Sequence, residues 1–311
     1  MTKPFVLGVD GGGSKTAAVI LDERAQPLGR GFAGAANYHL VGEEEAQAAV
    51  REAMFKAAAA ASVDLANAAA AVWALAGAGS EADRQLLAGL CADLLPGVPG
   101  AVVTDAEAAL AGGVAGGAGI VLIAGSGMMV YGVNGAGESA RAGGWGHLLD
   151  TGGGYALALA GLKAATRALD GAAPPTRLQR LLLDALPLDD LVNLPQWLYA
   201  PNRRGAEIAA LAPRVLAAAA AGDETAIEIA DAGALALATS AGAVARRLRL
   251  DATPSFPLTW TGGLLTFSAF YRALTLRAIA EQVPAARPQP PTHDAAVGAG
   301  LLAWKHLHAQ R

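Results

Sequence analysis

Short apolar runs alternate with segments of helical periodicity along the first part of the chain. An apolar run at Phe5–Val9 is followed, after a glycine-rich stretch, by a second run at Ala17–Leu21. Two such runs joined by a glycine turn predict a β-hairpin. Residues 42–61 begin with three glutamates and continue with apolar residues at helical spacing, which predicts a helix. The next expected elements are a strand at Val72–Ala76, a helix from Ser80 to about Leu95 and a strand at Ala101–Thr104.

The second part of the chain repeats the hairpin pattern and then becomes almost entirely helical. Ile120–Ala124 and Met128–Val133 are apolar runs around another glycine turn, and helical, alanine-rich patterns fill Tyr155 to about Leu250. The last expected elements are a strand at Leu258–Thr261, a helix to about Val283, a proline-rich connection at Pro284–Pro291 and a terminal helix at Asp294–His308. This order predicts two α/β domains, residues 1–115 and 116–293, with a helical insertion in the second. The terminal helix, residues 294–311, is a candidate addition to the first domain.

Composition and charge exclude several classes of protein. Apolar residues make up 53% of the 311-residue chain, which excludes intrinsic disorder, and its 39 glycines follow no three-residue period, which excludes collagen. A net charge of −4 without a basic cluster argues against nucleic-acid binding. The single cysteine, Cys91, excludes an internal disulfide and a cysteine-based metal cluster.

The charge-free stretch Ala108–Gly137 does not indicate a membrane protein. The stretch is long enough to span a membrane, but its alanine and glycine content favours loop, strand and turn. Because no signal-peptide pattern precedes the first strand, we expect a cytoplasmic protein with no membrane partner. The glycines at 112–119 are interpreted as a mobile linker between the two domains.

The first chemistry-bearing segment is Asp10-Gly11-Gly12-Gly13-Ser14-Lys15-Thr16. Glycines let backbone N–H groups approach phosphate oxygens, and Ser14 and Thr16 can add hydroxyl donors. The segment nearly matches a Walker A loop, yet Ser14 stands where that loop has glycine, and a strand rather than a helix is expected to follow. A P-loop nucleotidase and an ordinary hairpin turn remain alternatives.

Two further segments complement the first. Gly125-Ser126-Gly127 is a second glycine turn, and a pair of such turns can hold a triphosphate from two sides. Asp105 follows a strand and precedes a helix, where α/β sheets place their chemistry. It could accept a proton from a substrate hydroxyl while Asp10 holds magnesium through water. Alternatively, Asp105 caps the helix that begins at Ala106, and the two roles are compatible; Glu107 is a weaker candidate base.

Polar and aromatic residues around two later glycine clusters suit a sugar and a nucleotide base. Between Gly143 and Tyr155, the carboxylate of Asp150 suits sugar hydroxyls and the ring of Trp145 suits sugar C–H groups, on a loop that we expect to be mobile. His147 is more typical of a structural histidine. Gly262-Gly263, after a strand, permits close approach of a base and ribose, although a plain helix entry is an equally good interpretation.

Together these segments resemble the N-acetylglucosamine kinase family, within the superfamily of sugar kinases, actin and heat-shock ATPases, from Val6 to about Ala303. Gly8–Thr16 and Gly125-Ser126-Gly127 resemble its two phosphate motifs, and Thr104-Asp105-Ala106 resembles the segment with the catalytic aspartate. Trp260-Thr261-Gly262-Gly263 resembles the adenosine motif, Gly143-Gly144-Trp145-Gly146-His147 the sugar loop, and Asn37 the sugar-contacting asparagine. The family commonly reads Gly-Asp-Glu-Gly-Ser after the histidine; here Asp150-Thr151-Gly152-Gly153 is one residue shorter, and the aspartate is carried over to Asp150.

The resemblance implies two actin-like (ribonuclease H-like) α/β domains around a nucleotide cleft. It implies an ATP-dependent, Mg²⁺-assisted kinase, a homodimer, that phosphorylates N-acetylglucosamine or glucosamine at the 6-hydroxyl with Asp105 as base. The implied ATP-binding residues are Gly11, Gly12, Gly13, Ser14, Lys15, Thr16, Gly125, Ser126, Gly127, Gly262 and Gly263. The implied sugar-binding residues are Asn37, Asp105, Gly144, Trp145 and Asp150, and Asp10 is the implied metal site, through water.

Alternatives within the same fold remain open. N-acetylmuramic acid is a further candidate substrate, and a sugar-independent ATPase or a non-catalytic sugar sensor would share these motifs. Acyl-CoA dehydratase activators and zinc-binding repressor-type sugar kinases need several cysteines, which one Cys91 cannot supply.

Overall fold

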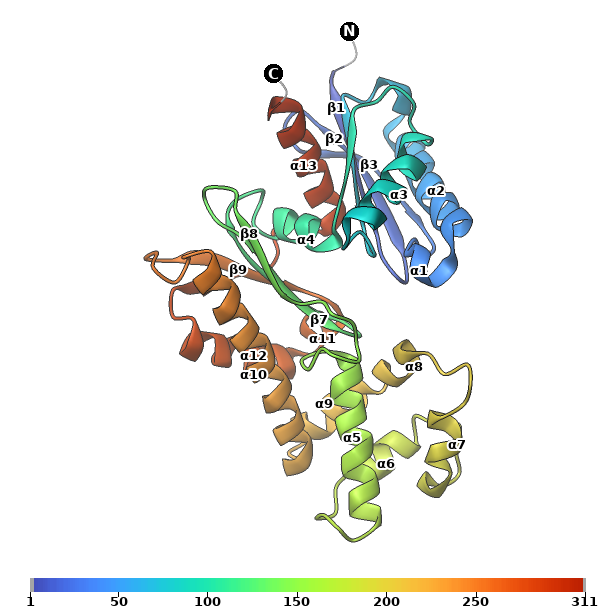
Figure 1. Cartoon of the computed structure of the whole chain (residues 1–311), viewed down its shortest axis with the longest axis vertical. Coiled ribbons are helices and arrows are strands. Elements are labelled where there is room, and N and C mark those ends of the chain that lie inside the picture. Colours follow the sequence, from blue (N-terminus) through green and yellow to red (C-terminus); the bar gives the residue numbers. More distant parts are fainter. Residues whose placement is uncertain (1–2, 310–311) are drawn as a thin grey trace. The chain divides into compact units, whose positions relative to one another are not determined.

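The computed structural model describes residues 3–309 and divides the chain into two compact units (Figure 1). Unit 1 comprises residues 1–117 and 290–311, and unit 2 comprises residues 118–289. Each unit holds a five-stranded mixed sheet covered by helices.

The sheet of unit 1 has the strand order β3-β2-β1-β4-β5. Its antiparallel part is β1 (Phe5–Gly11), β2 (Thr16–Asp22) and β3 (Pro27–Ala33), whereas β4 (Ala70–Leu75) and β5 (Gly100–Val103) run parallel to β1. Gly11 pairs with Thr16 across the first glycine turn, which confirms the hairpin. A P-loop would need a helix where β2 lies, so that alternative is excluded.

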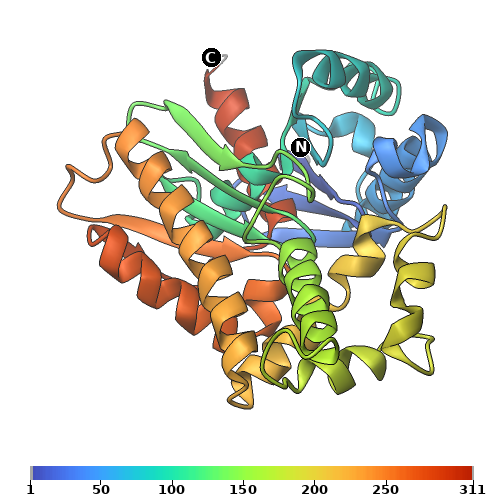
Figure 2. The ribbon, with the colours of Figure 1, turned by 60° about the horizontal axis from the view of Figure 1, so that its bottom comes forward.

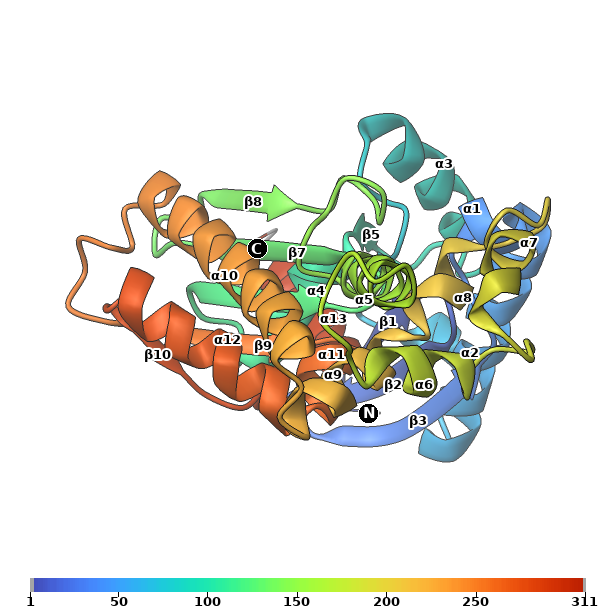
Figure 3. The same ribbon diagram turned by 90° about the horizontal axis from the view of Figure 1, so that it is seen from below.

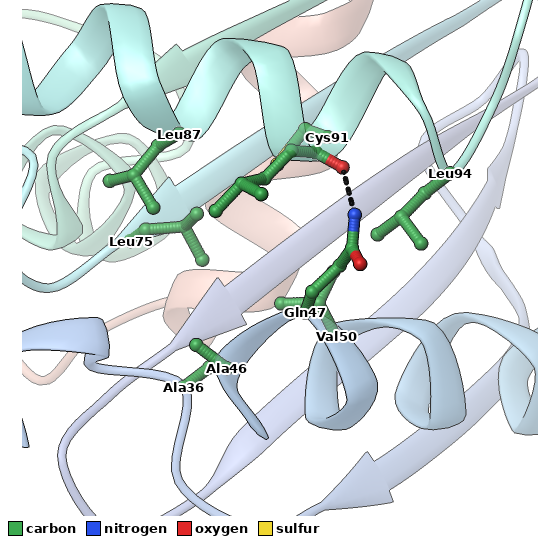
Figure 4. A pocket seen from close by; sticks show the side chains of 9 residues that line it. Ala36, Ala46, Gln47, Val50, Leu75, Leu87, Cys91 and Leu94 are labelled. Carbon is green, nitrogen blue, oxygen red and sulfur yellow. Dashed lines mark hydrogen bonds between the residues drawn. The ribbon is translucent and has the colours of Figure 1, made fainter. Parts of the chain in front are cut away.

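Side chains alternate along β1 and build a core on each face of this sheet. Phe5, Leu7 and Val9 join the core formed with α2 (Glu43–Ala61) and α3 (Glu81–Ala92). On that face Gln47 Nε2 donates to the Leu90 carbonyl oxygen (2.9 Å) across a small apolar gap (Figure 4). Val6 lies on the opposite face and joins the core with α13 (Ala295–Ala309). The remaining elements of the unit are α1 (Tyr38–Val41), the 3₁₀ turn Leu65–Asn67 and α4 (Asp105–Gly113).

Helix α13 packs unusually closely, because glycines line its contacts. A Cβ added at Gly298 would lie 1.9 Å from the Ala108 carbonyl oxygen on α4. A Cβ on Gly8 of β1 would lie 2.3 Å from the backbone of both Ala296 and Gly300. The last helix of the chain is therefore an integral part of the N-terminal unit.

The sheet of unit 2 has the strand order β10-β9-β6-β7-β8. Antiparallel β6 (Gly119–Ala124) and β7 (Met128–Val133) confirm the second hairpin. Strand β8 (Ser139–Gly143) pairs antiparallel with β7, and β9 (Phe256–Thr261) pairs parallel with both β6 and β10 (Ala286–Pro288).

Helices follow from residue 154 onward, as the sequence predicted. They are α5 (Gly154–Leu169), α6 (Leu178–Leu183), α7 (Leu194–Leu198), α8 (Gly205–Ala209), α9 (Ala212–Ala220), α10 (Glu224–Arg247), α11 (Gly263–Phe267) and α12 (Ala269–Gln282), with a 3₁₀ turn at Leu191–Asn193. Helix α10 is long and apolar enough to cross a membrane by length and composition alone. It lies against β7, β8 and α12 of its own unit (Figures 2 and 3), as a core helix does.

Three expectations from the sequence need correction. The edge strands β3, β8 and β10 were not expected, and β10 lies inside the stretch that we interpreted as a proline-rich connection. The helix expected after Gly263 is two helices, separated at Ser268. The glycines at 112–119 are not one linker: Gly112 and Gly113 end α4, and Gly119 begins β6.

Candidate active site

The candidate residues of unit 1 gather at one edge of its sheet. Strands β1, β4 and β5 are parallel, and β3 runs in the same direction, so the segments that follow all four begin at the same edge. The Ala76 amide, after β4, donates to the Gly11 carbonyl oxygen (2.8 Å). The Ala36 amide, after β3, donates to the Gly12 carbonyl oxygen (2.9 Å). The first glycine turn is thereby fixed from both sides.

Within this turn, the exposed and the buried hydroxyl have different surroundings. The Gly12 amide closes the turn on the Lys15 carbonyl oxygen (2.9 Å), and Gly13, Ser14 and Lys15 are exposed. Thr16 is fully buried, and its hydroxyl donates to the Gly34 carbonyl oxygen (2.8 Å). The Thr16 hydroxyl is therefore engaged within unit 1, and Ser14 carries the hydroxyl that is free to meet a ligand.

Asp105 is the first residue of α4 and not its cap. Thr104 is the N-cap: its Oγ1 accepts from the Glu107 amide (3.2 Å), and the Glu107 carboxylate accepts from the Thr104 amide (2.7 Å). The interpretation of Asp105 as the capping residue is therefore wrong, and Glu107 is occupied by the cap. Asp105 is half-buried, with Oδ1 accepting from the Ala106 amide (2.9 Å).

Burial raises the pKa of the Asp105 carboxyl, and the hydrogen bond from the Ala106 amide opposes part of this rise. A carboxylate with a raised pKa accepts a proton more readily at neutral pH than an ordinary aspartate does. Asp105 thus has the surroundings of a general base.

Asp10 is a second carboxylate of raised pKa at this edge. Burial first, and then the nearby carboxylates of Asp105 and Asp294, raise its pKa to about 7, while Lys15 opposes the rise. Within residues 3–309, no hydrogen bond or ion pair reaches the Asp10 side chain, whereas Asp294 is paired with Arg30 (2.5 Å).

A half-buried, uncompensated carboxylate beside another carboxylate suits a hard cation such as Mg²⁺. The described residues contain no group of three or more His, Cys, Asp or Glu side chains that would hold a metal without help. Any Mg²⁺ here would therefore take most of its ligands from water and from a bound phosphate.

Asn37 lies on the same edge, at the start of α1. Its Oδ1 accepts from the His39 amide (3.1 Å), so Asn37 is the N-cap of this short helix. Its Nδ2 has no acceptor among the described residues and is free to donate to a ligand.

In unit 2, the second glycine turn is built into the start of α5. The amides of Gly154 and Tyr155 donate to the carbonyl oxygens of Gly125 (2.8 Å) and Ser126 (2.9 Å). Ser126 itself is exposed at the tip of the turn. The turn and the N-terminus of α5 therefore form one rigid arrangement, and helix N-termini favour anions.

The segment from Gly143 to Gly154 is held by hydrogen bonds at Asp150 and at Gly152. Asp150 is only 7% exposed, and its carboxylate accepts from the amides of Trp145 (3.3 Å) and Gly146 (3.2 Å). The Tyr271 hydroxyl donates to the Gly152 carbonyl oxygen (3.0 Å) from α12. In this arrangement Asp150 shapes the loop from inside.

The aromatic residues of this loop have opposite surroundings. Trp145 is 69% exposed, and the Arg141 guanidinium lies over its ring, 4.7 Å from the ring centre. His147 packs against the Tyr155 ring, 4.6 Å between centroids, and against the backbone of Gly205. His147 is thus a packed structural residue, as expected, and Trp145 is the ring open to a ligand.

The third glycine motif of unit 2, Gly262-Gly263, lies at the edge of its own sheet, where β9 ends beside the end of β6. Gly262 has φ +91°, and a Cβ there would lie 2.3 Å from the Ala124 carbonyl oxygen. Only glycine fits this position, where the end of β9 meets the end of β6. Next to Gly263 lies a pocket of about 350 Å³, lined by α9, α11 and α12. Phe267, which is 88% exposed, forms part of the wall of this pocket. Neither the pocket nor Phe267 was predicted from the sequence, although the apolar residues after Gly263 could have indicated an apolar surface there.

Comparisons with known proteins agree with this geometry. A curated N-acetyl-D-glucosamine kinase of Dictyostelium discoideum is 34% identical over 97% of this chain and 98% of its own length. An N-acetylmuramic acid/N-acetylglucosamine kinase of Clostridium acetobutylicum is 32% identical over 96% of this chain and 98% of its own length.

Solved structures share the fold. A Chromobacterium violaceum protein described as a candidate N-acetylglucosamine kinase has a TM-score of 0.77 at 26% identity, covering 97% of this chain and 99% of that one. A glucokinase of the ROK family from Streptomyces griseus has a TM-score of 0.63 at 18% identity, covering 97% and 99%.

The two mixed sheets and their glycine turns define the actin-like fold of ATP-dependent sugar kinases, and the predicted fold class and enzyme class are confirmed. The chain belongs to the BadF/BadG/BcrA/BcrD ATPase family, whose model matches residues 7–303. The resemblance to N-acetylglucosamine kinases is likewise confirmed.

Proposed function

We propose that this chain transfers the γ-phosphoryl group of ATP to the 6-hydroxyl of N-acetylglucosamine or glucosamine. The observation that carries the proposal is Asp105: Thr104 and Glu107 cap α4, and this leaves a half-buried carboxylate of raised pKa at the sheet edge. The curated relatives act on N-acetylglucosamine by name, which supports an amino-sugar acceptor.

Unit 1 supplies the acid–base and phosphate chemistry in this proposal. Asp105 orients the sugar hydroxyl and accepts its proton as the oxygen attacks phosphorus. The exposed residues Gly13, Ser14 and Lys15 bind the outer phosphates, and Gly12 closes the turn that presents them. Bound Mg²⁺ would neutralise phosphate charge during transfer, with Asp10 holding one of its waters. The buried Thr16 hydroxyl keeps the turn in place.

Unit 2 supplies groups for ATP and for the sugar. The Gly125–Gly127 turn and the adjoining N-terminus of α5 bind phosphate, and Ser126 adds an exposed hydroxyl. The apolar pocket beside Gly263 takes adenine, with Phe267 against the base. Gly144 and Trp145 contact the sugar, together with Asn37 from unit 1, and Asp150 holds their loop by its two backbone hydrogen bonds.

N-acetylmuramic acid is a second candidate acceptor, because of Arg141. This residue donates to the Gly143 and Gly144 carbonyl oxygens (3.0 and 3.2 Å), and no carboxylate pairs with it within residues 3–309. An unpaired guanidinium beside the sugar loop suits the carboxylate that distinguishes N-acetylmuramic acid from N-acetylglucosamine.

Turnover on a panel of sugars tests the proposal. ADP release would be measured with glucosamine, N-acetylglucosamine, N-acetylmannosamine, N-acetylmuramic acid and glucose, and without sugar. We expect release that depends on an amino sugar, with phosphate on the 6-oxygen of the product. ADP release without sugar would support the ATPase alternative, and sugar binding without any ADP release would support the sensor. Cytoplasmic location and a homodimer are further proposals, which fractionation and sedimentation would check.

A further inference from the structure

Helix α1 carries Asn37 at its start but has little means of holding itself in place. It is one turn long, Tyr38–Val41, and none of its side chains is buried. A single helical turn is not stable by itself, and the apolar support of α1 is limited to the partly buried Tyr38, which packs against the core beneath α2 and α3. The position of Asn37 therefore depends largely on how Tyr38 and His39 are held.

Asp83 of α3 makes those contacts. Its Oδ1 accepts from the Tyr38 hydroxyl and lies 3.6 Å from His39 Nε2. Its Oδ2 accepts from the Ser80 amide (3.1 Å) and from the Ser80 hydroxyl, as part of the capping box of α3. One carboxylate thus joins α1 to the rigid N-terminus of α3.

A second contact fixes the other side of the same segment. Gly77, at φ +100°, lies so close that an added Cβ would be 3.1 Å from His39, 3.3 Å from Tyr38 and 3.4 Å from Asn37 Oδ1. Gly77 follows Ala76, which is hydrogen-bonded to Gly11 at the first glycine turn. The loop after β4 therefore supplies the surface against which α1 rests, and the first turn of α3, which follows this loop, supplies the carboxylate that binds it.

We propose that Asp83 is a positioning residue for sugar binding, which acts by holding Tyr38 and His39 so that the Asn37 carboxamide keeps a fixed direction. The proposal rests on the proposed function, in which Asn37 contacts the sugar. The cap bond from the His39 amide fixes the orientation of the Asn37 carboxamide, and the donor that it leaves for the sugar is Nδ2, whose direction is set by the placement of α1.

The test compares Tyr38→Phe, Asn37→Ala and the double variant in steady-state kinetics. Tyr38→Phe removes the hydroxyl that donates to Asp83 and leaves the capping box of α3 intact. Loss of one hydrogen bond to a carboxylate is expected to raise the KM for the sugar about tenfold, with the KM for ATP changed by less than about twofold. Since Tyr38 acts through Asn37, the double variant should have the sugar KM of Asn37→Ala alone.

Ser80→Ala is the matched control. It weakens the cap of α3 but keeps the bond between Tyr38 and Asp83, so it should lower the melting temperature and leave the sugar KM within about twofold. Amide hydrogen exchange without substrate gives an independent readout: residues 38–42 should exchange faster in Tyr38→Phe than in the wild-type protein or in Ser80→Ala.

The outcomes separate the two proposals. If the wild-type protein phosphorylates no sugar, the proposed function is wrong. If it does, and the effects of Tyr38→Phe and Asn37→Ala on sugar KM multiply in the double variant, the positioning role of Asp83 is wrong. An equal rise in the KM for ATP and for sugar, or unchanged exchange of residues 38–42, would also overturn it.

Discussion

Thr104 and Glu107 satisfy each other's backbone amides at the start of α4, through bonds of 2.7 and 3.2 Å. This reciprocal cap leaves Asp105, between them, without a structural task beyond one bond to the next amide. Helix geometry thus holds the Asp105 backbone rigidly while its carboxylate remains chemically available.

Asp105→Asn should keep the binding of ATP and sugar and lower kcat by about 10²–10⁴-fold, because the amide cannot accept the proton. The melting temperature should change little, since the cap is made by Thr104 and Glu107. Binding is measured by calorimetry and turnover by a coupled assay. Unchanged kcat would remove Asp105 from the role of base.

Asp10→Asn should make the protein more stable at pH 8 and less active. The pKa of Asp10 is raised from its ordinary value, 3.8, to about 7, so the folded protein holds this proton more tightly than the unfolded chain. The free energy of unfolding therefore falls as pH rises from about 4 to about 7, by up to about 4 kcal/mol from this group. Asparagine removes that loss.

Urea unfolding of both proteins without nucleotide, at pH 4.5 and pH 8, measures this effect. The difference between Asp10→Asn and wild type should be small at pH 4.5 and large at pH 8. A variant that is less stable than wild type at pH 8 would show that the Asp10 carboxylate is not a burden to the fold.

Phe267→Ala should raise the KM for ATP several-fold and leave the KM for the sugar unchanged. The side chain is 88% exposed and lies on the wall of the pocket beside Gly263. It therefore contributes little to folding stability, and its ring can stack on a planar base. Phe55, an exposed phenylalanine of α2, provides the control: Phe55→Ala should alter neither constant. Equal KM values for ATP in all three proteins would place adenine elsewhere.

Gly298→Ala should lower the free energy of unfolding and Gly89→Ala should raise it, although both glycines are in helices. At Gly298 the new methyl group would lie 1.9 Å from a carbonyl oxygen of α4, and such overpacking costs about 1–3 kcal/mol or more. At Gly89, on the exposed side of α3, the methyl group meets no atom within 4 Å, and stability should rise by about 0.5–1 kcal/mol. Denaturant unfolding of the two variants checks both signs.

The interior strands could be predicted from the sequence, whereas of the four edge strands only β5 was predicted. Strands β1, β2 and β6 are continuous apolar runs in which nearly every residue is buried, because both faces of the sheet are covered there, whereas buried and half-buried residues alternate along β7. Strand β3 has the sequence Pro-Leu-Gly-Arg-Gly-Phe-Ala. Its glycines allow α2 to pack closely against the strand, since a Cβ on Gly31 would be 2.1 Å from the Ala53 carbonyl oxygen. In the sequence, a glycine that is needed for close packing against a helix cannot be distinguished from a glycine that forms a turn.

The candidate site likewise has features that could be predicted from the sequence and features that could not. The motifs around Asp10, Asp105 and Gly125 are contiguous in sequence, and the structure places each at the edge of its sheet. The anchoring of the Asp150 loop was missed, because it depends on Tyr271, 119 residues away in the chain. The capping residue of α4 was misassigned by one position, since Thr104 and Asp105 are both good N-caps and only the pairing with Glu107 distinguishes them.

The location of α13 in unit 1 has a consequence for biosynthesis. Translation delivers the strands of this unit before unit 2, yet the helix that covers one face of its sheet, through Val6 and Val19, is made only after the whole of unit 2. Unit 2 is complete in the nascent chain before unit 1 can be, so the usual order, in which N-terminal domains fold first, is reversed here. Until α13 has been made, the uncovered apolar face of the first sheet is a surface for chaperones, and a chain that lacks α13 should accumulate in inclusion bodies.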